Sequence, residues 1–351
     1  MAKQTLAVKY RPKSFDDVVE QQAIKDILTD QIKTGTFQHS YLFCGPAGCG
    51  KTTAARIFAN DINQGKGNPI EVDAASNNGV DNVREIIDGA RRKPLDSDYK
   101  IYIIDECHML STGAWNAMLK LLEEPPKTTV FIMCTTDPQK IPATILSRVQ
   151  RYNFSKISLD NIIERLKFIV DCEADEIMNV GGPDCAYSYT EEAIQYIAKL
   201  ADGGMRDAIT MMDKCLSLDP DLTVESVVRA LGTVDYHTHF DLLLKMETGV
   251  KDSAIKVIED VYNSGKDLKQ FIKQFQYFVL DVCKYKMFRD FKYISIPALP
   301  EYKEKLEDED LDLALEVLEW VRQLNADIKW ESNPKAITET AIILFRSQEV
   351  A

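Results

Sequence analysis

The residues with the clearest chemical signature form a glycine-rich loop over 45–52, which reads GPAGCGKT. The loop matches the pattern G-x-x-x-x-G-K-[ST], whose glycines let backbone N–H groups turn inward around phosphate oxygens. Because the pattern is intact and follows an apolar run, it favours a phosphate site over a simple glycine turn. The residues expected to bind phosphate are Gly45, Pro46, Ala47, Gly48, Cys49, Gly50, Lys51, Thr52 and Thr53.

Two adjacent carboxylates supply the second half of this chemistry. Asp105 and Glu106 end the apolar run IYIID and begin the segment ECH. We expect Asp105 to share Mg²⁺ with the hydroxyl of Thr52, and Glu106 to orient or deprotonate a water molecule. Acidic residues after a strand also occur for structural reasons, but the phosphate loop upstream favours hydrolysis of ATP. His108 is expected to pack rather than to act as a base or a metal ligand.

A parallel sheet would bring these groups to one edge. In the first half of the chain, short apolar runs alternate with amphipathic stretches, which is typical of such a sheet covered by helices on both faces. Strands are predicted at 40–44, 70–73, 101–105, 129–134 and 151–154. Helices are predicted at 52–62, 81–92 and 113–124, the last halted by two prolines. The predicted fold class is an α/β P-loop NTPase with a five-stranded parallel sheet.

Helical periodicity replaces the strand signals after about residue 156. Apolar residues recur at three- and four-residue spacing over 158–177, 190–201 and 205–218, and further helical patterns follow the turn-rich segment 219–223. We expect three domains, a nucleotide-binding domain over 1–156, a small helical domain over 157–222 and a C-terminal helical domain over 223–351.

The bulk composition narrows the class of protein. The 351 residues carry a formal net charge of −13, which argues mildly against nucleic-acid binding but says nothing about a local basic face. No apolar run approaches the length of a membrane span and the start lacks a signal-peptide core, so we expect a cytoplasmic protein. The 8 cysteines include no C-x-x-C pair, which favours reduced, buried thiols over a zinc module.

Longer stretches of the sequence carry a family resemblance that extends over nearly the whole chain. They are KYRPKSFDDVVEQ, HSYLFCGPAGCGKTTAARIFA, EVDAASNNGVDNVREI, IYIIDECHMLS, AMLKLLEEPP, TTDPQKIPATILSRVQRYNF and GGMRDAI. The chain resembles bacterial DNA polymerase III gamma/tau subunits, the ATPases of the clamp loader, within the AAA+ superfamily. The replication factor C small subunits share this architecture but fit the stretches less well.

The resemblance implies further roles. Thr136 corresponds to a sensor of the γ-phosphate, and Arg206 to a second sensor on the helical lid formed by 157–222. Arg148 corresponds to an arginine finger that reaches the ATP site of a neighbouring subunit. On their own, the threonine would be taken for a turn cap and both arginines for surface ion-pair partners. The segment lining the adenine pocket corresponds to Tyr10, Arg11, Val18 and Val19.

The same resemblance implies partners. It predicts a pentamer with other loader subunits, held together by the C-terminal domain, that opens a sliding clamp and closes it on primed DNA. Arg84, Arg91 and Arg92 are candidates for contacts with the DNA backbone, although a solvated helix face explains them equally well. A clamp-facing surface is expected around Met109, Leu110 and Trp115, unless these residues pack in the core.

One departure from the family concerns a zinc-binding insertion with four cysteines. Here the corresponding interval, 60–69, reads NDINQGKGNP, so we expect no zinc site and a divergent or phage-encoded version. Two other functions compete with the motor, namely a non-hydrolysing ATP-binding scaffold of a loader-like complex and a hexameric branch-migration or helicase-loading relative. Lys51, Asp105, Glu106 and Arg148 are all present, which favours the motor over the scaffold, and the branch-migration relative would not predict the stretches DAASNNG, LEEPP and TTDPQKIP.

Overall fold

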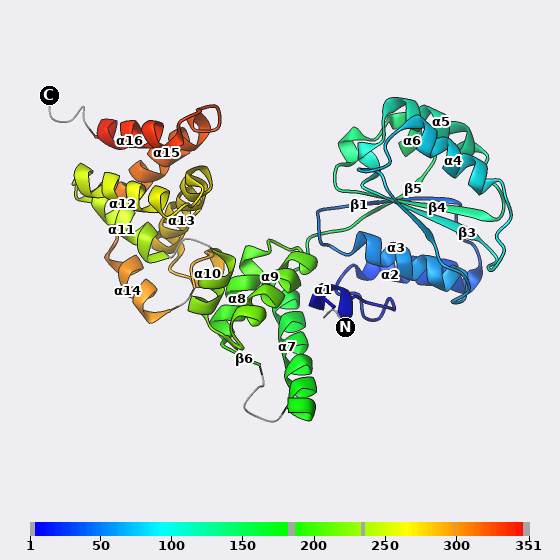
Figure 1. Ribbon diagram of the computed structural model, residues 1–351, viewed down its shortest axis with the longest axis horizontal. Helices are drawn as coiled ribbons and strands as arrows, with labels where there is room; N and C mark the ends of the chain where they lie inside the picture. Colours follow the sequence, from blue (N-terminus) through cyan, green and yellow to red (C-terminus); the bar gives the residue numbers. More distant parts are fainter. Residues whose placement is uncertain (1–3, 182–186, 233–235, 298, 347–351) are drawn as a thin grey trace. The chain divides into compact units, whose positions relative to one another are not determined.

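The computed structural model describes residues 4–181, 187–232, 236–297 and 299–346. The chain forms two compact units (Figure 1). The first comprises the residues up to 169 together with 201–213, and the second comprises 170–200 and the residues from 214 onward. The expected division into three domains at 156 and 222 stays a prediction.

The first unit is built on a five-stranded parallel sheet with the strand order β2-β3-β4-β1-β5. Its strands are β1 (Ser40–Cys44), β2 (Ile70–Asp73), β3 (Lys100–Asp105), β4 (Thr129–Thr135) and β5 (Gln150–Asn153). Every residue of β1 and β4 is buried, because both faces of these central strands are covered. This arrangement confirms the predicted α/β class with five parallel strands.

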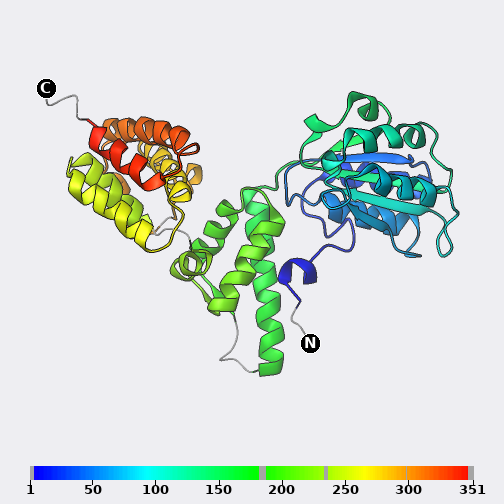
Figure 2. The ribbon, with the colours of Figure 1, turned by 45° about the horizontal axis from the view of Figure 1, so that its top comes forward.

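Helices cover the sheet on both faces (Figures 1 and 2). Side chains that alternate along a strand face opposite layers, so Tyr41 and Phe43 of β1 pack in one layer while Leu42 and Cys44 pack in the other. The first layer holds α2 (Gln22–Thr34) and α3 (Lys51–Ile62), and the second holds α4 (Val80–Ala90), α5 (Thr112–Glu123) and α6 (Ala143–Leu146). The short segments of this unit are α1 (Leu6–Lys9), η1 (Cys107–Met109) and η2 (Pro138–Lys140).

The ends of these elements place the functional residues. The phosphate loop joins β1 to α3, the acidic pair closes β3, and Thr136 follows β4. Because parallel strands present their carboxyl ends at one edge, all three segments meet there. Helix α5 starts at the cap Ser111, whose hydroxyl accepts a hydrogen bond from the Ala114 N–H, and it ends before Pro125, as the sequence predicts.

The second unit is helical. It contains α8 (Glu191–Leu200), α10 (Val224–Leu231), α11 (Tyr236–Glu247), α12 (Lys251–Asn263), α13 (Leu268–Phe288), η4 (Phe291–Tyr293), α14 (Pro300–Asp308), α15 (Leu311–Asp327) and α16 (Pro334–Leu344). Helices α7 (Leu159–Gly181) and α9 (Met205–Leu218) contribute residues to both units. Two strands of two residues each, β6 (Ser188–Tyr189) and β7 (Asp221–Leu222), pair in parallel and were not expected from the sequence. None of the described helices is long and apolar enough to cross a membrane.

Candidate nucleotide-binding site

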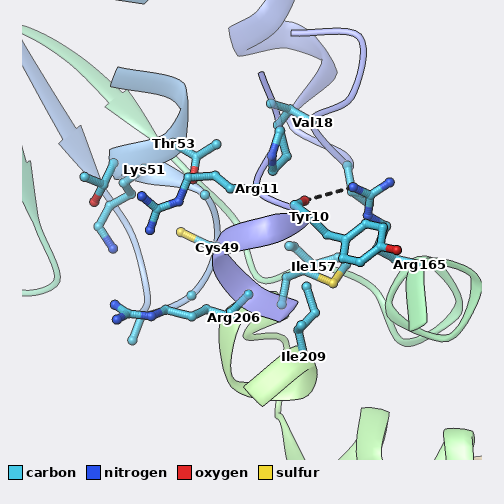
Figure 3. A pocket seen from close by; sticks show the side chains of 18 of the residues that line it. Tyr10, Arg11, Val18, Cys49, Lys51, Thr53, Ile157, Arg165, Arg206 and Ile209 are labelled. Atoms are coloured by element: carbon cyan, nitrogen blue, oxygen red, sulfur yellow. Dashed lines mark hydrogen bonds between the residues drawn. The ribbon is translucent and has the colours of Figure 1, made fainter. Parts of the chain in front are cut away.

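A cavity of about 200 Å³ opens in the first unit at the carboxyl edge of the sheet (Figure 3). Most of the residues predicted to bind nucleotide line it, namely Tyr10, Arg11, Val18, Val19, Ala47, Gly48, Cys49, Gly50, Lys51, Thr52, Thr53, Asp105, Glu106 and Arg206. The sequence analysis missed six other lining residues, Ala7, Pro12, Ile157, Arg165, Met205 and Ile209. Segments that are far apart in the sequence therefore enclose one space.

The phosphate loop is tightly constrained by its own atoms and by the start of α9. The Lys51 Nζ donates to the carbonyl oxygens of Gly45, at 2.8 Å, and Pro46, at 2.7 Å. Gly48 has φ +70°, and a Cβ on it would lie 2.9 Å from the Cα of Gly204. The Met205 N–H also donates to the Gly48 carbonyl at 3.1 Å. The loop therefore requires glycine at position 48 and is held against the turn that precedes α9.

The two predicted magnesium ligands lie together. The Thr52 Oγ1 donates to the Asp105 Oδ2 at 2.8 Å, so a hydroxyl and a carboxylate converge beside the phosphate loop. Oxygen ligands of this kind fit Mg²⁺, which is usually bound by one or two protein groups together with phosphates and water. No group of three or more His, Cys, Asp or Glu side chains among the described residues could hold a metal ion.

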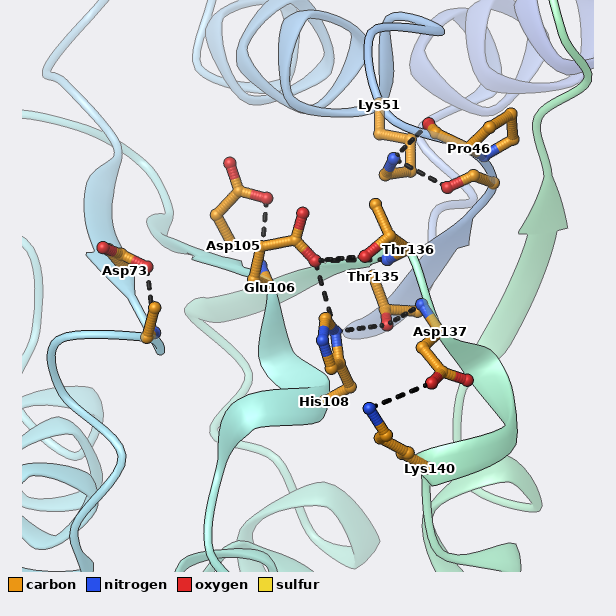
Figure 4. Close-up of polar contacts among 12 residues, drawn as sticks. Pro46, Lys51, Asp73, Asp105, Glu106, His108, Thr135, Thr136, Asp137 and Lys140 are labelled. Atoms are coloured by element: carbon orange, nitrogen blue, oxygen red, sulfur yellow. Dashed lines mark hydrogen bonds and ion pairs between the residues drawn. The ribbon is translucent and has the colours of Figure 1, made fainter. Parts of the chain in front are cut away.

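Glu106 and Thr136 meet across neighbouring strand ends (Figure 4). The Glu106 Oε2 accepts hydrogen bonds from the Thr136 Oγ1, at 2.8 Å, and from the Thr136 N–H, at 3.2 Å. Glu106 has φ +45°, a left-handed conformation that is costly for a side-chain-bearing residue and is often found at functional sites. Thr136 does not line the cavity, but it is hydrogen-bonded to Glu106, which does.

His108 differs from the expectation that it only packs. Its Nδ1 lies 3.1 Å from the Thr135 Oγ1 and 3.2 Å from the Glu106 Oε2, and the side chain is 11% exposed. The histidine is therefore a polar neighbour of the carboxylate. Its position two residues after Glu106 could have predicted this contact, because the short helical turn η1 brings the ring back toward the glutamate side chain.

The end of the cavity away from Lys51 is mostly apolar. Val18, Ile157 and Ile209 line it together with Tyr10, which matches the flat, apolar surface of a nucleotide base. The Arg165 Nη2 of α7 donates to the Tyr10 carbonyl at 3.1 Å and so fixes the backbone on this side. Arg206 reaches the cavity from the first turn of α9, next to the phosphate loop (Figure 3).

Arg148 stands apart from the cavity of its own chain, since it is not among the lining residues. Its guanidinium makes an ion pair with the Glu123 Oε1, through Nη2 at 2.5 Å and Nε at 2.9 Å. The Nη1 donates to the Thr144 carbonyl. This arginine is thus held by groups at the ends of α5 and α6.

The arginines proposed for DNA contact lie along α4 and just after it. Arg84 is exposed and pairs with Asp81 at 2.8 Å, one turn earlier in the helix. Arg91 is the C-cap of α4, and Arg92 follows it.

The apolar residues proposed for a clamp surface differ in exposure. Leu110 and Trp115 are buried in the core, and of the three only Met109, at 46% exposure, faces outward.

The thiols of the first unit are buried, and burial raises their pKa values. Cys44, Cys49, Cys107 and Cys134 are all buried. Burial raises the pKa of the Cys49 thiol, in the phosphate loop, although nearby Lys51 opposes the shift. Burial also raises the pKa values of Cys107 and Cys134 well above the ordinary value. Of these thiols, Cys49 lines the cavity, and Cys107 and Cys134 pack in the hydrophobic core.

Two protein families match separate parts of the chain. The family described as DNA polymerase III, delta subunit, matches residues 70–158, and the family described as DNA polymerase III subunits gamma and tau domain III matches residues 222–327. Together the matched segments span more than half of the chain. Among solved structures, the Holliday junction branch migration motor RuvB of Thermotoga maritima aligns with a TM-score of 0.50 and 19% identity. That alignment covers 68% of this chain and 79% of the RuvB chain, and it supports the fold alone.

Curated relatives agree with these families over longer alignments. DNA polymerase III subunit tau of Bacillus subtilis is 34% identical over 98% of this chain and 63% of its own length. DNA polymerase III subunit tau of Escherichia coli is 35% identical over 76% of this chain and 43% of its own length. The chain thus spans less than two thirds of each relative. On these matches, the chain is a homologue of DNA polymerase III gamma and tau subunits over most of its own length.

Proposed function

We propose that the protein is the ATPase motor subunit of a replication clamp loader. It binds and hydrolyses ATP to open a sliding clamp and load it onto primed DNA. One observation carries the proposal: Lys51, Thr52, Asp105 and Glu106 line one cavity in a homologue of the gamma and tau subunits. A P-loop alone supports only phosphate binding, whereas a carboxylate beside it supports hydrolysis.

The side chains divide the chemistry among them. Lys51 and the backbone N–H groups of the loop hold the β- and γ-phosphates. Thr52 and Asp105 hold Mg²⁺, which neutralises phosphate charge when it is bound. Glu106 orients the attacking water and accepts its proton, and Thr136 fixes the glutamate through two hydrogen bonds to one oxygen.

The proposal places Arg148 in the ATP site of a neighbouring subunit. Support comes from its absence from the lining of its own cavity and from the guanidinium, which suits the charge that spreads over a transferred phosphoryl group. Catalysis then belongs to the assembly, in which other loader subunits, the clamp and primed DNA are the partners. Arg84, Arg91 and Arg92 would contact the DNA backbone, where binding is salt-sensitive and independent of base sequence.

ATP turnover tests this function directly. We would measure hydrolysis by the assembled complex with and without primed DNA and a clamp, comparing the wild type with Arg148→Ala. Arg151→Ala, which alters an exposed arginine that bonds to Asn153 on β5, is the matched control. The expected result is stimulation by DNA and clamp that Arg148→Ala abolishes and Arg151→Ala preserves.

Each failure has its own meaning. If DNA and clamp leave the rate unchanged, the chain is not a loader motor. If the complex binds ATP but never hydrolyses it, the non-hydrolysing scaffold is correct. If Arg148→Ala turns over normally in the assembly, the trans-acting role of this arginine is wrong.

A further inference from the structure

A pair of strained residues lies between the base end of the cavity and helix α2. Glu20 and Gln21 have φ +57° and +58°, so two successive side-chain-bearing residues adopt the left-handed conformation. This conformation is unfavourable for any residue with a Cβ and persists only where surrounding contacts enforce it. The pair therefore points to a local structural demand that ordinary helix entry does not make.

The contacts that enforce this geometry reach across the first unit to the segment after β5. The Gln21 Nε2 donates to the Ser155 carbonyl at 2.8 Å, and its Oε1 accepts from the Ser155 N–H at 3.2 Å. The Glu20 Oε2 accepts from the Ser158 N–H at 2.8 Å. We call these four residues, Glu20, Gln21, Ser155 and Ser158, the clasp. Gln21 is 8% exposed, so its amide is committed to this pairing.

The clasp joins two walls of the nucleotide cavity. Val18 and Val19, which directly precede it, line the cavity on one side. Ile157, between the two serines, lines it from the linker that connects β5 to α7. The clasp thus adds direct hydrogen bonds between these two walls.

Further backbone contacts continue the path from the linker to the phosphate loop. The Ile157 N–H donates to the Gly203 carbonyl at 3.1 Å, and the Lys156 Nζ pairs with Asp202 at 2.6 Å. Two residues on, the Met205 N–H donates to the Gly48 carbonyl at 3.1 Å. The path from Val19 through the clasp, the linker and the turn before α9 thus closes around the cavity and returns to the loop.

We propose that Gln21 is a positioning residue that sets the affinity of the cavity for the base of the nucleotide, by fixing Val18 and Val19 against the linker that carries Ile157. The phosphate end does not depend on it, because Gly48 is tied directly to Met205 and Lys51 to its own loop. The inference rests on the proposed function, since it assumes that the cavity binds a nucleotide.

Two ligands separate the base end from the phosphate end. ADP occupies both ends, whereas inorganic tripolyphosphate occupies only the phosphate end. By isothermal titration calorimetry with Mg²⁺ on the full chain, Gln21→Ala is expected to raise the Kd for ADP about tenfold, the size of one to two lost hydrogen bonds. The Kd for tripolyphosphate is expected to stay within about twofold of the wild-type value.

Matched variants guard against a trivial loss of folding. Gln22→Ala removes the same side chain one position on, where it is exposed and bonds only to Asp26 among the described contacts. It is expected to leave both ligands unaffected. Gln21→Glu keeps the volume and one acceptor but opposes a carboxylate to the Ser155 carbonyl, so it should weaken ADP binding even if the alanine variant does not fold.

The outcomes are distinguishable. If the wild type binds neither ligand, the proposed function itself is wrong. If the wild type binds both and the Gln21 variants bind ADP normally, the positioning role is wrong. A parallel loss of ADP and tripolyphosphate would also overturn it, because that pattern reports general damage to the unit.

Discussion

Ionisable side chains at the sheet edge of the first unit have polar partners, whereas a buried histidine of the second unit has none among the described residues. At the sheet edge of the first unit, Lys51 donates to two carbonyls and Glu106 accepts from both the backbone and the hydroxyl of Thr136. In the helical core of the second, His239 is 3% exposed, and neither ring nitrogen has a hydrogen-bond partner among the described residues. Its ring stacks on Phe271 at 5.2 Å and on Phe278 at 5.4 Å.

The pKa values follow from these surroundings. Burial lowers the pKa of His239 to about 3, so the ring is neutral and acts as another aromatic side chain. Burial, together with neighbouring Glu247, raises the pKa of Glu309 to about 9. Lys51 and Glu106 can exchange their polar partners for a ligand, whereas His239, which has no partner among the described residues, gives up its charge. The burial of an ionisable residue is therefore not by itself a sign of function.

The largest expected effect is on catalysis and belongs to the first unit. Glu106→Gln keeps an acceptor for Thr136 but removes the proposed base, so kcat for ATP in the assembled complex should fall about 10²–10⁴-fold. Glu309→Gln is the control from the second unit, since it replaces a carboxyl that is already protonated at neutral pH. Steady-state phosphate release should fall for the first variant and not for the second. Equal losses would mean that the contrast between the regions is false.

The strands were predictable because a parallel sheet buries both faces of its strands. The observed bounds of β1 and β2 match the prediction, β3 and β4 are each one residue longer at one end, and β5 is shifted by one residue toward the N-terminus. The two-residue strands β6 and β7 could not be predicted, since pairs this short carry no periodicity.

The cavity was predictable only where its residues sit in a motif. The phosphate loop and the acidic pair can be predicted from the spacing of neighbouring residues. Ile157 reaches the cavity from the linker between β5 and α7, Arg165 from α7 and Ile209 from α9, through long-range packing that no local pattern encodes. Gln21 is similar, because its partner Ser155 lies 134 residues away in the sequence.

A second effect should appear in the stability of the helical unit at acid pH. A histidine with a pKa near 3 in the folded state and about 6.5 when unfolded favours unfolding as pH falls below 6.5. This term should cost about 2 kcal/mol at pH 5 relative to pH 7. His239→Phe removes it, so the stability of the variant relative to the wild type should rise by that amount on acidification.

Urea unfolding of both proteins at pH 7 and pH 5 measures that difference. Taking the variant against the wild type cancels the opposite contribution of Glu309, whose raised pKa favours folding at low pH and is lost as pH rises toward 9. A relative stability that does not change with pH would mean that His239 is solvated or partnered in solution. ATP turnover at pH 7 should be the same for both proteins.

A third effect tests the magnesium pair of the first unit. Asp105→Asn keeps a hydrogen-bond acceptor for the Thr52 hydroxyl but removes the charge that attracts the cation. The Mg²⁺ concentration for half-maximal ATP turnover should rise about tenfold, as expected when one charged ligand is lost. Asp281→Asn, which alters a buried carboxylate of the second unit that accepts from the Ser295 N–H, should leave the Mg²⁺ requirement unchanged. An unchanged requirement in Asp105→Asn would remove this residue from the metal site.

The smallest effect distinguishes two surface ion pairs of the same sequence spacing. Arg84 pairs with Asp81 on α4, and Arg322 pairs with Glu319 on α15, each at a spacing of three residues. Exposed pairs contribute little to folding, so neither Arg84→Ala nor Arg322→Ala should shift the midpoint of thermal unfolding. If α4 follows the DNA backbone, only Arg84→Ala should lower the slope of log K against log salt for primed DNA, by about one unit. Fluorescence anisotropy with the assembled complex at several salt concentrations measures that slope. Equal slopes for the two variants would mean that Arg84 does not contact DNA and lies on a solvated helix face.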